Sequence, residues 1–308
     1  MKMPELVFSE EIGEYFKDLA AKNEVCYEVA RKARRVGRDP KTEVEVPQAQ
    51  DLASRVEKLL EDYNVTGVAE QIRRLTDEFG NREIVSLKTA EYMAAHSEGM
   101  PPEKALDRAI RVGLAVLTEG ILVAPLEGIA DTKIKQNPDG TQFVDLIFAG
   151  PIRAAGGTAQ AMSVLLADVV RHQLGIGEYK PTQGEIDRFL EEIPLYKQCQ
   201  HIQYSPSNEE IRLIVGNCPI MIDGEGTERV EISGFRDLPR IATNQVRGGA
   251  CLVVAEGMCL KAAKLQKHVK KLGLQGWDFM DRYLEMKGAA AKRPQPLRIP
   301  APIRFRLR

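Results

Sequence analysis

One junction near the middle of the chain constrains its fold more than any other segment. Residues 148–161 read FAGPIRAAGGTAQA and contain a Gly-Pro and a Gly-Gly pair, which are strong turn signals. The apolar, β-prone run 143–148 precedes them, and 159–174 repeats its apolar residues at helical spacing. This order predicts a strand that turns sharply into a helix, so the chain must combine strands with helices.

The glycines of this junction suit a phosphate as well as a turn. Thr158 is placed to cap the helix, and Gly156 and Gly157 would let a ligand approach the backbone closely. A helix N-terminus beside Arg153 attracts anions. A tight turn that binds nothing explains the same residues equally well. A phosphoryl-transfer enzyme built on Gly156-Gly157-Thr158 is one alternative function, but the GxxxxGK[ST] pattern with its lysine is absent.

Residues up to about 120 are predicted to be almost wholly helical. Helix starts such as Ser9-Glu10-Glu11 and Pro101-Pro102-Glu103 support this interpretation. The expected helices cover 9–35, 49–63, 68–79, 82–96 and a segment that starts at 101.

Residues 121–272 are predicted to mix strands and helices. Asn137-Pro138-Asp139-Gly140 is a hairpin signal between strands at 129–136 and 141–148. Thr182 and Glu185 match a capping box for a helix that ends near Glu192. The remaining expected elements are short strands at 211–215, 219–222 and 229–232, an apolar run at 248–254 and a long basic helix at 256–272. The fold class is therefore α+β, a helical part over 1–120 followed by a mixed α/β part.

Three segments are expected along the chain. Residues 1–47 form a helix and linker suited to docking a partner, 48–280 form the main α+β domain, and 281–308 form a basic, Pro-rich tail, unstructured or truncated. The net charge is −1, yet 256–308 holds 13 Lys and Arg against 4 Asp and Glu. A polyanion is therefore expected to bind at the C-terminal end.

Composition excludes several classes of protein. Charged residues make up 28% of the chain, and acidic residues and Pro125 interrupt the longest apolar stretch, 113–130, so no membrane span is expected. The five cysteines form no CxxC pair, which favours a reducing, cytoplasmic setting. Cys199, His201 and Cys218 could supply three zinc ligands, but free thiols in a core explain them better, and no metal site is predicted.

Two groups of basic residues are candidates for binding DNA phosphates. Lysine supplies a mobile charge and arginine a planar fork of donors. The alternative is a solvated helix face for the lysines, and for Arg236 and Arg247 ion pairs with Asp237, Glu225 or Glu228. No catalytic constellation is recognised, because Asp223-Gly224-Glu225 is interpreted as a turn and Glu191-Glu192 as a solvated helix face. The candidates are Lys261, Lys264, Lys267 and Lys271 in the basic helix, and Arg153, Arg236 and Arg247 in glycine-bearing turns.

Several motifs occur in an order typical of one family. The junction at 148–161 follows EGILVAPLEGI at 119–129. Further motifs are GEYKPT at 177–182, NCPIMIDGE at 217–225, GFRDLPR at 234–240, TNQVRGG at 243–249, AEG at 255–257 and LQKHV at 265–269. Together they resemble the N-terminal portion of the large subunit of archaeal family D DNA polymerase over nearly all of residues 5–280. Gly226 departs from the family pattern, which has proline there.

The resemblance implies a role within a larger enzyme. The family's catalytic double-psi β-barrel and its metal-binding aspartates match no segment here, so this chain is expected to be a fragment without a catalytic residue. The intact enzyme would extend DNA primers with Mg²⁺ and pair with a small exonuclease subunit, at the nucleoid in the cytoplasm. This segment would bind the small subunit or primer-template DNA, and a homo-oligomer is a further expectation. A free-standing nucleic-acid-binding module is the alternative.

Overall fold

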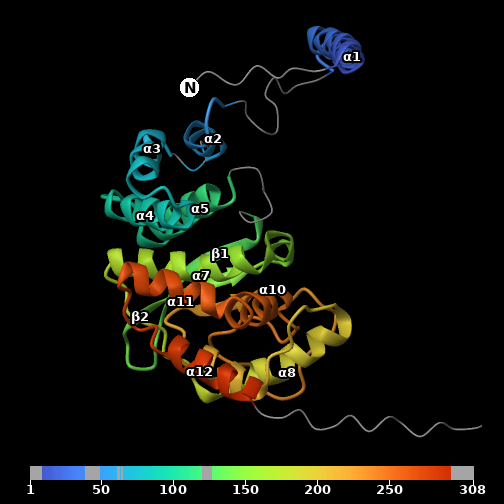
Figure 1. Cartoon of the computed structure of the whole chain (residues 1–308). Helices are drawn as coiled ribbons and strands as arrows, with labels where there is room; N and C mark the ends of the chain where they lie inside the picture. The colour runs from blue at the N-terminus through green and yellow to red at the C-terminus, as the bar shows by residue number, and fades with distance from the viewer. Residues whose placement is uncertain (1–8, 39–48, 61–62, 64, 120–126, 293–308) are drawn as a thin grey trace, which may run out of the picture. The chain divides into compact units, whose positions relative to one another are not determined.

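A computed structural model describes most of the chain (Figure 1). It covers residues 9–38, 49–60, 63, 65–119 and 127–292, with side chains up to residue 289. By its internal contacts the chain divides into two units, Met1–Gln48 and Ala49–Arg308. Each unit is described by itself.

Helix α1, Glu10–Arg35, is the described element of the first unit. Ser9 caps it, because its hydroxyl accepts a hydrogen bond from the Ile12 N–H at 3.5 Å. Acidic residues occupy the first turn and basic residues the last, which suits the helix dipole. No residue of α1 is buried. The helix predicted over 9–35 is confirmed, and residues 39–47 of the expected linker lie outside the described residues.

Four helices open the second unit, and local signals start them. They are α2 (Leu52–Leu59), α3 (Val68–Phe79), α4 (Arg82–Ala95) and α5 (Pro102–Leu117). Asp51 caps α2 through the Ser54 N–H at 2.8 Å, and Asn81 caps α4 through the Ile84 N–H at 3.0 Å. The helical character predicted up to about residue 120 is confirmed over the described residues.

A three-stranded sheet follows, with the strand order β1-β2-β3. Strands β1 (Ile129–Gln136) and β2 (Gln142–Phe148) form the predicted antiparallel hairpin. Strand β3 (Met221–Gly224) pairs with β2 in parallel, with Asp145 opposite Met221. A parallel neighbour requires a crossover connection, and here several helices provide it. The α+β class is confirmed.

The crossover begins at the glycine junction. A 3₁₀ helix, η2 (Gly150–Ala155), leads into helix α7 (Gly156–Gln173), as the predicted strand-to-helix turn requires. Helix α7 is almost entirely buried and contacts α4 and α5, β2, and the segments near residues 253–272. Figure 1 shows α4 and α5 on one side of α7 and the later helices α10 and α11 on the other. Helix α7 is therefore the central element of this unit.

The last part of the chain is mainly helical. Helix α8 starts at the predicted capping box, in which Thr182 and Glu185 bond reciprocally. It continues past the predicted end near Glu192, through Pro194, because its apolar face is buried to Tyr196. The elements are α8 (Gln183–Cys199), α9 (Asn208–Val215), α10 (Gly248–Leu252), the π-helix η3 (Val253–Cys259), α11 (Ala262–Leu272) and α12 (Phe279–Lys292).

Two of the predicted strands are absent from the described residues. Residues 211–215 are helical in α9, because Ser207 and Glu210 form a second capping box that starts a helix there. The apolar run 248–254, for which no type of element was predicted, is helical, since it forms α10 and the start of η3. Residues 229–232 form no regular strand, only a single bridge between Glu231 and Gln245. Short apolar runs fit strands and buried helices equally well, which explains these errors.

The basic helix and the tail also differ from the prediction. The expected helix 256–272 is interrupted at Leu260-Lys261, between the π-helix η3 and α11. Residues 281–292, assigned to an unstructured tail, belong to α12. Trp277, Phe279 and Tyr283 are buried against the core there, and this apolar burial stabilises the helix. The basic, Pro-rich composition of 281–308 had indicated an unstructured tail instead. The tail residues 293–308 lie outside the described residues.

Candidate nucleic-acid interface

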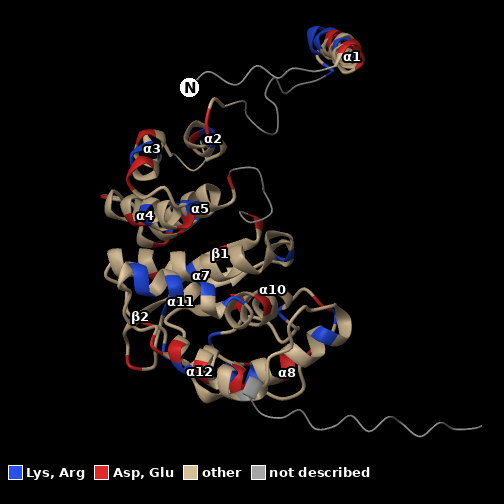
Figure 2. Ribbon diagram, viewed as in Figure 1, with Lys and Arg blue, Asp and Glu red and all other residues tan. Residues whose placement is uncertain are grey.

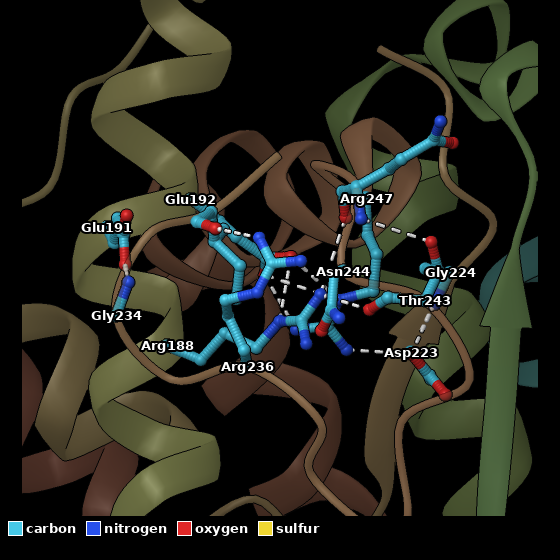
Figure 3. Close-up of polar contacts among 12 residues, drawn as sticks. Arg188, Glu191, Glu192, Asp223, Gly224, Gly234, Arg236, Thr243, Asn244 and Arg247 are labelled. Atoms are coloured by element: carbon cyan, nitrogen blue, oxygen red, sulfur yellow. Dashed lines mark hydrogen bonds and ion pairs between the residues drawn. The ribbon is translucent and has the colours of Figure 1, made fainter. Parts of the chain in front are cut away.

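A buried ion network lies between α8, β3 and the turn before α10 (Figure 3). The guanidinium of Arg247 is fully buried, with Nη2 2.6 Å from Glu192 Oε2 and Nη1 2.7 Å from Asp223 Oδ1. Arg188, also buried, donates from Nε to Glu192 Oε1 at 3.0 Å. Burial disfavours the charge of Arg247, but the two carboxylates outweigh this cost and raise the pKa of Arg247. These charges therefore stabilise one another inside the protein.

The network extends to the sheet through Asp145. Its carboxylate is fully buried on β2, with Oδ2 2.5 Å from Lys135 Nζ of β1, and Lys135 lies 3.7 Å from Asp223 of β3. Burial, followed by repulsion from Asp223, raises the pKa of Asp145 to about 7. Each of the three strands thus supplies one ionisable side chain to the same buried ion network.

A second cluster joins two of the sequence motifs. Arg240 donates from Nε to Glu185 Oε1 at 2.7 Å, and its guanidinium lies 5.1 Å from the ring centres of Phe143 and Tyr179. Tyr179 donates its hydroxyl hydrogen to Glu185 Oε2 at 3.0 Å, and burial raises the pKa of Tyr179. These contacts fix the loop that carries Arg240 to the start of α8.

The two clusters join four of the sequence motifs. Residues 177–182 supply Tyr179, 217–225 supply Asp223, 234–240 supply Arg240 and 243–249 supply Arg247. All four segments meet around the same core, although up to 72 positions separate them in the sequence. What these motifs share in the structure is a buried polar framework.

The three candidate arginines have different surroundings. Arg247 is completely buried, so the expectation that it contacts DNA is corrected: it holds Glu192 and Asp223. Arg236 is partly exposed and lies 2.9 Å from Glu231, which was not among its expected partners. Arg153 is exposed, and both of its terminal nitrogens donate to the His201 carbonyl oxygen at 3.0 and 2.8 Å. Only Arg236 and Arg153 could be reached by DNA.

The start of α7 is a packing site. Ala155 is the N-cap residue and makes no side-chain bond, so Thr158 does not cap the helix as expected. Gly156 has a φ of +73°, which favours glycine there. A Cβ on Gly157 would lie 2.5 Å from the Glu256 carbonyl oxygen of η3 and 3.0 Å from Lys261 Cε. The backbone of η3 thus covers the helix start where a nucleotide phosphate would bind, which removes the support for phosphoryl transfer.

Helix α11 carries a strip of positive charge, visible as blue bands in Figure 2. We call Lys261, Lys264, Lys267 and Lys271 the basic face. Lys264, Lys267 and Lys271 are exposed, while Lys261 is half-buried beside Gly157. Lys264 forms an ion pair with Glu83 of α4, whereas no ion pair of Lys267 or Lys271 is found among the described residues. A cavity of about 720 Å³ lies beside these lysines, between α4 and α11.

Several charged residues of the buried ion network were not predicted from the sequence patterns. Glu192 is fully buried in α8, so its interpretation as part of a solvated face is corrected, and Asp223 is buried in β3 rather than part of a turn. A usable signal existed for Asp145, the one charged residue in the apolar run 143–148. A charge in a buried strand needs a partner, which predicts a buried ion pair.

The cysteines contribute no site. Cys199 is exposed, whereas Cys218 is buried and burial raises the pKa of its thiol to about 12. Within the described ranges, no group of three or more His, Cys, Asp or Glu side chains could hold a metal ion. None of the described helices is both long and apolar enough to cross a membrane.

Comparison with known proteins identifies the family. The family model described as "DNA polymerase II large subunit DP2, N-terminal" matches residues 14–286. The DNA polymerase II large subunits of Picrophilus torridus and Methanococcoides burtonii are 49% and 50% identical to this chain over 87% and 92% of its length. That of Archaeoglobus fulgidus is 49% identical over 91% of it. The chain spans 24% of the length of each of these relatives. It belongs to the DNA polymerase II large subunit family and corresponds to the N-terminal part of that subunit.

Proposed function

We propose that this chain is the N-terminal part of the large subunit of a DNA-templated DNA polymerase, in which it acts as a scaffold that binds DNA through the basic face. Membership of the DNA polymerase II large subunit family supports a polymerase activity of the whole protein. The positive charge of α11 supports the contact with DNA. The nucleotidyl-transfer site, and the Mg²⁺ that it would use, are proposed to lie in other parts of the subunit, working in the cytoplasm at the nucleoid.

The basic face carries this proposal. Lys264, Lys267 and Lys271 are three and four positions apart, so they project from one side of the helix. Lysines in such a row match the repeated charges of a phosphate backbone and attract DNA without reading its sequence. The opposite side of α11 is anchored by buried Ala262, Leu265 and Val269. A rigid helix thus presents mobile charges to a ligand.

A salt titration of DNA binding tests the proposal. The probe is a labelled duplex oligonucleotide, and the variant is the triple substitution Lys264→Gln, Lys267→Gln and Lys271→Gln. We expect the slope of log K against log salt to fall in magnitude by roughly 2 to 3, because each phosphate contact contributes about 0.9. The control replaces three exposed lysines elsewhere: Lys104, Lys133 and Lys197. Equal losses in both triple variants would contradict the basic face as the binding site.

The exposed apolar side chains of helix α1 favour a second proposed role, which is docking of the small exonuclease subunit. Ile12, Tyr15, Phe16 and Leu19 are between 47% and 62% exposed, which is unusual for large apolar side chains so close together. We propose that the small subunit covers them. Leu19→Asp should then abolish binding of the purified small subunit in calorimetry. Self-association, measured by light scattering, would instead assign α1 to a homo-oligomer.

A free-standing nucleic-acid-binding module remains the second candidate function. The observation that favours it is the basic C-terminal quarter, which continues into residues 293–308. Deleting 287–308 should abolish salt-dependent DNA binding if this tail is the binding element. Retained binding would leave the basic face of α11 as the site.

A further inference from the structure

The cavity between α4 and α11 contains a carboxylate among cations. Three lysines and one histidine of α11 line it, together with the first turn of α4, which includes Glu83. The first-turn amides of α4 add positive partial charge to the same space. The cationic residues of the lining are Lys264, Lys267, Lys271 and, when protonated, His268.

Glu83 occupies the position of an anionic ligand. Its carboxylate forms an ion pair with Lys264 and lies 3.2 Å from His268 Nε2. The side chains of Glu83 and His268 are 19% and 8% exposed, so this contact is largely withdrawn from solvent. His268 Nε2 nevertheless has no hydrogen bond of good geometry. A buried polar atom without such a partner points to a ligand group that could supply it.

We propose that this cavity is a seat for one phosphodiester of a nucleic acid, and that Glu83 fills the seat when no nucleic acid is bound. The inference rests on the proposed DNA binding by the basic face. A phosphate oxygen replaces the Glu83 carboxylate on Lys264 and His268, while Lys267 and Lys271, which have no carboxylate of their own among the described residues, hold the neighbouring charge. The carboxylate then turns to solvent.

This exchange makes Glu83 a competitor of DNA. Binding must first separate Glu83 from Lys264, so part of the attraction between DNA and the basic face is offset. Glu83 therefore excludes weak or isolated anions and favours a polymer whose adjacent phosphates hold the other lysines at the same time.

The experiment compares Glu83→Gln with wild type in binding of the labelled duplex at 0.1 M salt. We expect the variant to bind about threefold to tenfold more tightly, since one repulsive charge near a phosphate is removed. The gain should disappear in the Lys264→Gln background, because Glu83 then has no lysine to occupy. Circular dichroism of each variant shows that the fold is kept.

Glu91→Gln is the matched control. Glu91 lies on the same helix, about 12 Å farther along, and pairs with Lys88 at 2.7 Å. At 0.1 M salt this distance exceeds the screening length of about 10 Å, so removing Glu91 should change duplex binding much less than removing Glu83. Equal gains in both glutamine variants would overturn the seat, because net charge alone would explain them.

Two further outcomes separate the alternatives. If wild type does not bind the duplex at all, the proposed function itself fails. If wild type binds through the three lysines but Glu83→Gln binds the duplex with unchanged affinity, only the proposed phosphodiester seat is contradicted. Inorganic phosphate that displaces the duplex far better than sulfate of equal ionic strength would show a site for free phosphate, which also overturns a phosphodiester seat.

Discussion

Arg247 and Arg236 lie in similar glycine-bearing turns, but their side chains end in different surroundings. Arg247 points into the core, where Glu192 and Asp223 neutralise it, and Arg236 remains 42% exposed beside Glu231. The turns alone do not distinguish them. A buried pair that loses one partner leaves an uncompensated charge, whereas an exposed pair contributes little. The structural role of Arg247 is therefore much stronger than that of Arg236.

At the same scale, Asp145 should make stability depend on pH. Its pKa is about 7 in the folded protein against 3.8 for the free group, so the folded state binds the extra proton between these values. Stability then falls as pH rises through this window and levels off above about 7. With about 1.4 kcal/mol per pKa unit, we expect a loss of roughly 3 kcal/mol between pH 5 and 8.

Denaturant unfolding at several pH values measures this effect. Asp145→Asn removes the titrating carboxyl but keeps its size, so its free energy of unfolding should lack this component of the pH dependence. The difference between wild type and the variant should therefore change with pH. Parallel profiles for the two proteins would contradict the assignment.

At the scale of secondary-structure elements, α7 and η3 cross at unusually short range. Gly157 of α7 faces the Glu256 carbonyl oxygen, and Gly257 of η3 lies against the backbone of Ala161, where a Cβ would be 3.1 Å from the amide nitrogen. Glycine on both sides lets the two backbones approach. The Gly-Gly of the junction and the Ala-Glu-Gly motif at 255–257 thus serve one contact.

Gly157→Ala should destabilise the protein by about 1–3 kcal/mol, because a methyl group 2.5 Å from a backbone oxygen forces the elements apart. Alanine is otherwise the better helix residue, so a net loss identifies the clash. The control is Gly150→Ala, whose Cβ would meet only Thr227 Cγ2 at 3.6 Å. Thermal unfolding compares the two, and equal midpoints would contradict the close crossing.

At the scale of the whole molecule, the described residues of α1 contribute nothing to a core. None of them is buried, and the chain divides by contacts after Gln48. Removing 1–48 should therefore leave the free energy of unfolding of the remainder within about 0.5 kcal/mol. Fluorescence of Trp277, the single tryptophan of the sequence and buried in the second unit, reports this unfolding. A large loss of stability would mean that 1–48 packs on the rest of the chain.

Local signals in the sequence determined most elements of this protein. The cap at Ser9, the turn at 137–140 and the capping box at Thr182 each lie within a few residues, so the chain encodes them without distant partners. The strand-to-helix junction and the basic charge of α11 could be predicted for the same reason, because their residues are also close together in the sequence.

The tertiary structure alone decided that Arg247 and Glu192 are buried and that the apolar run 248–254 is helical. The apolar run 248–254 is helical because it packs against other helices, which a short apolar run does not indicate by itself. Likewise, Arg247 meets Glu192 across 55 positions of sequence. Such a contact exists only after folding closes the chain between them, so no local pattern could have predicted that this arginine holds the core together while the lysines of α11 remain at the surface.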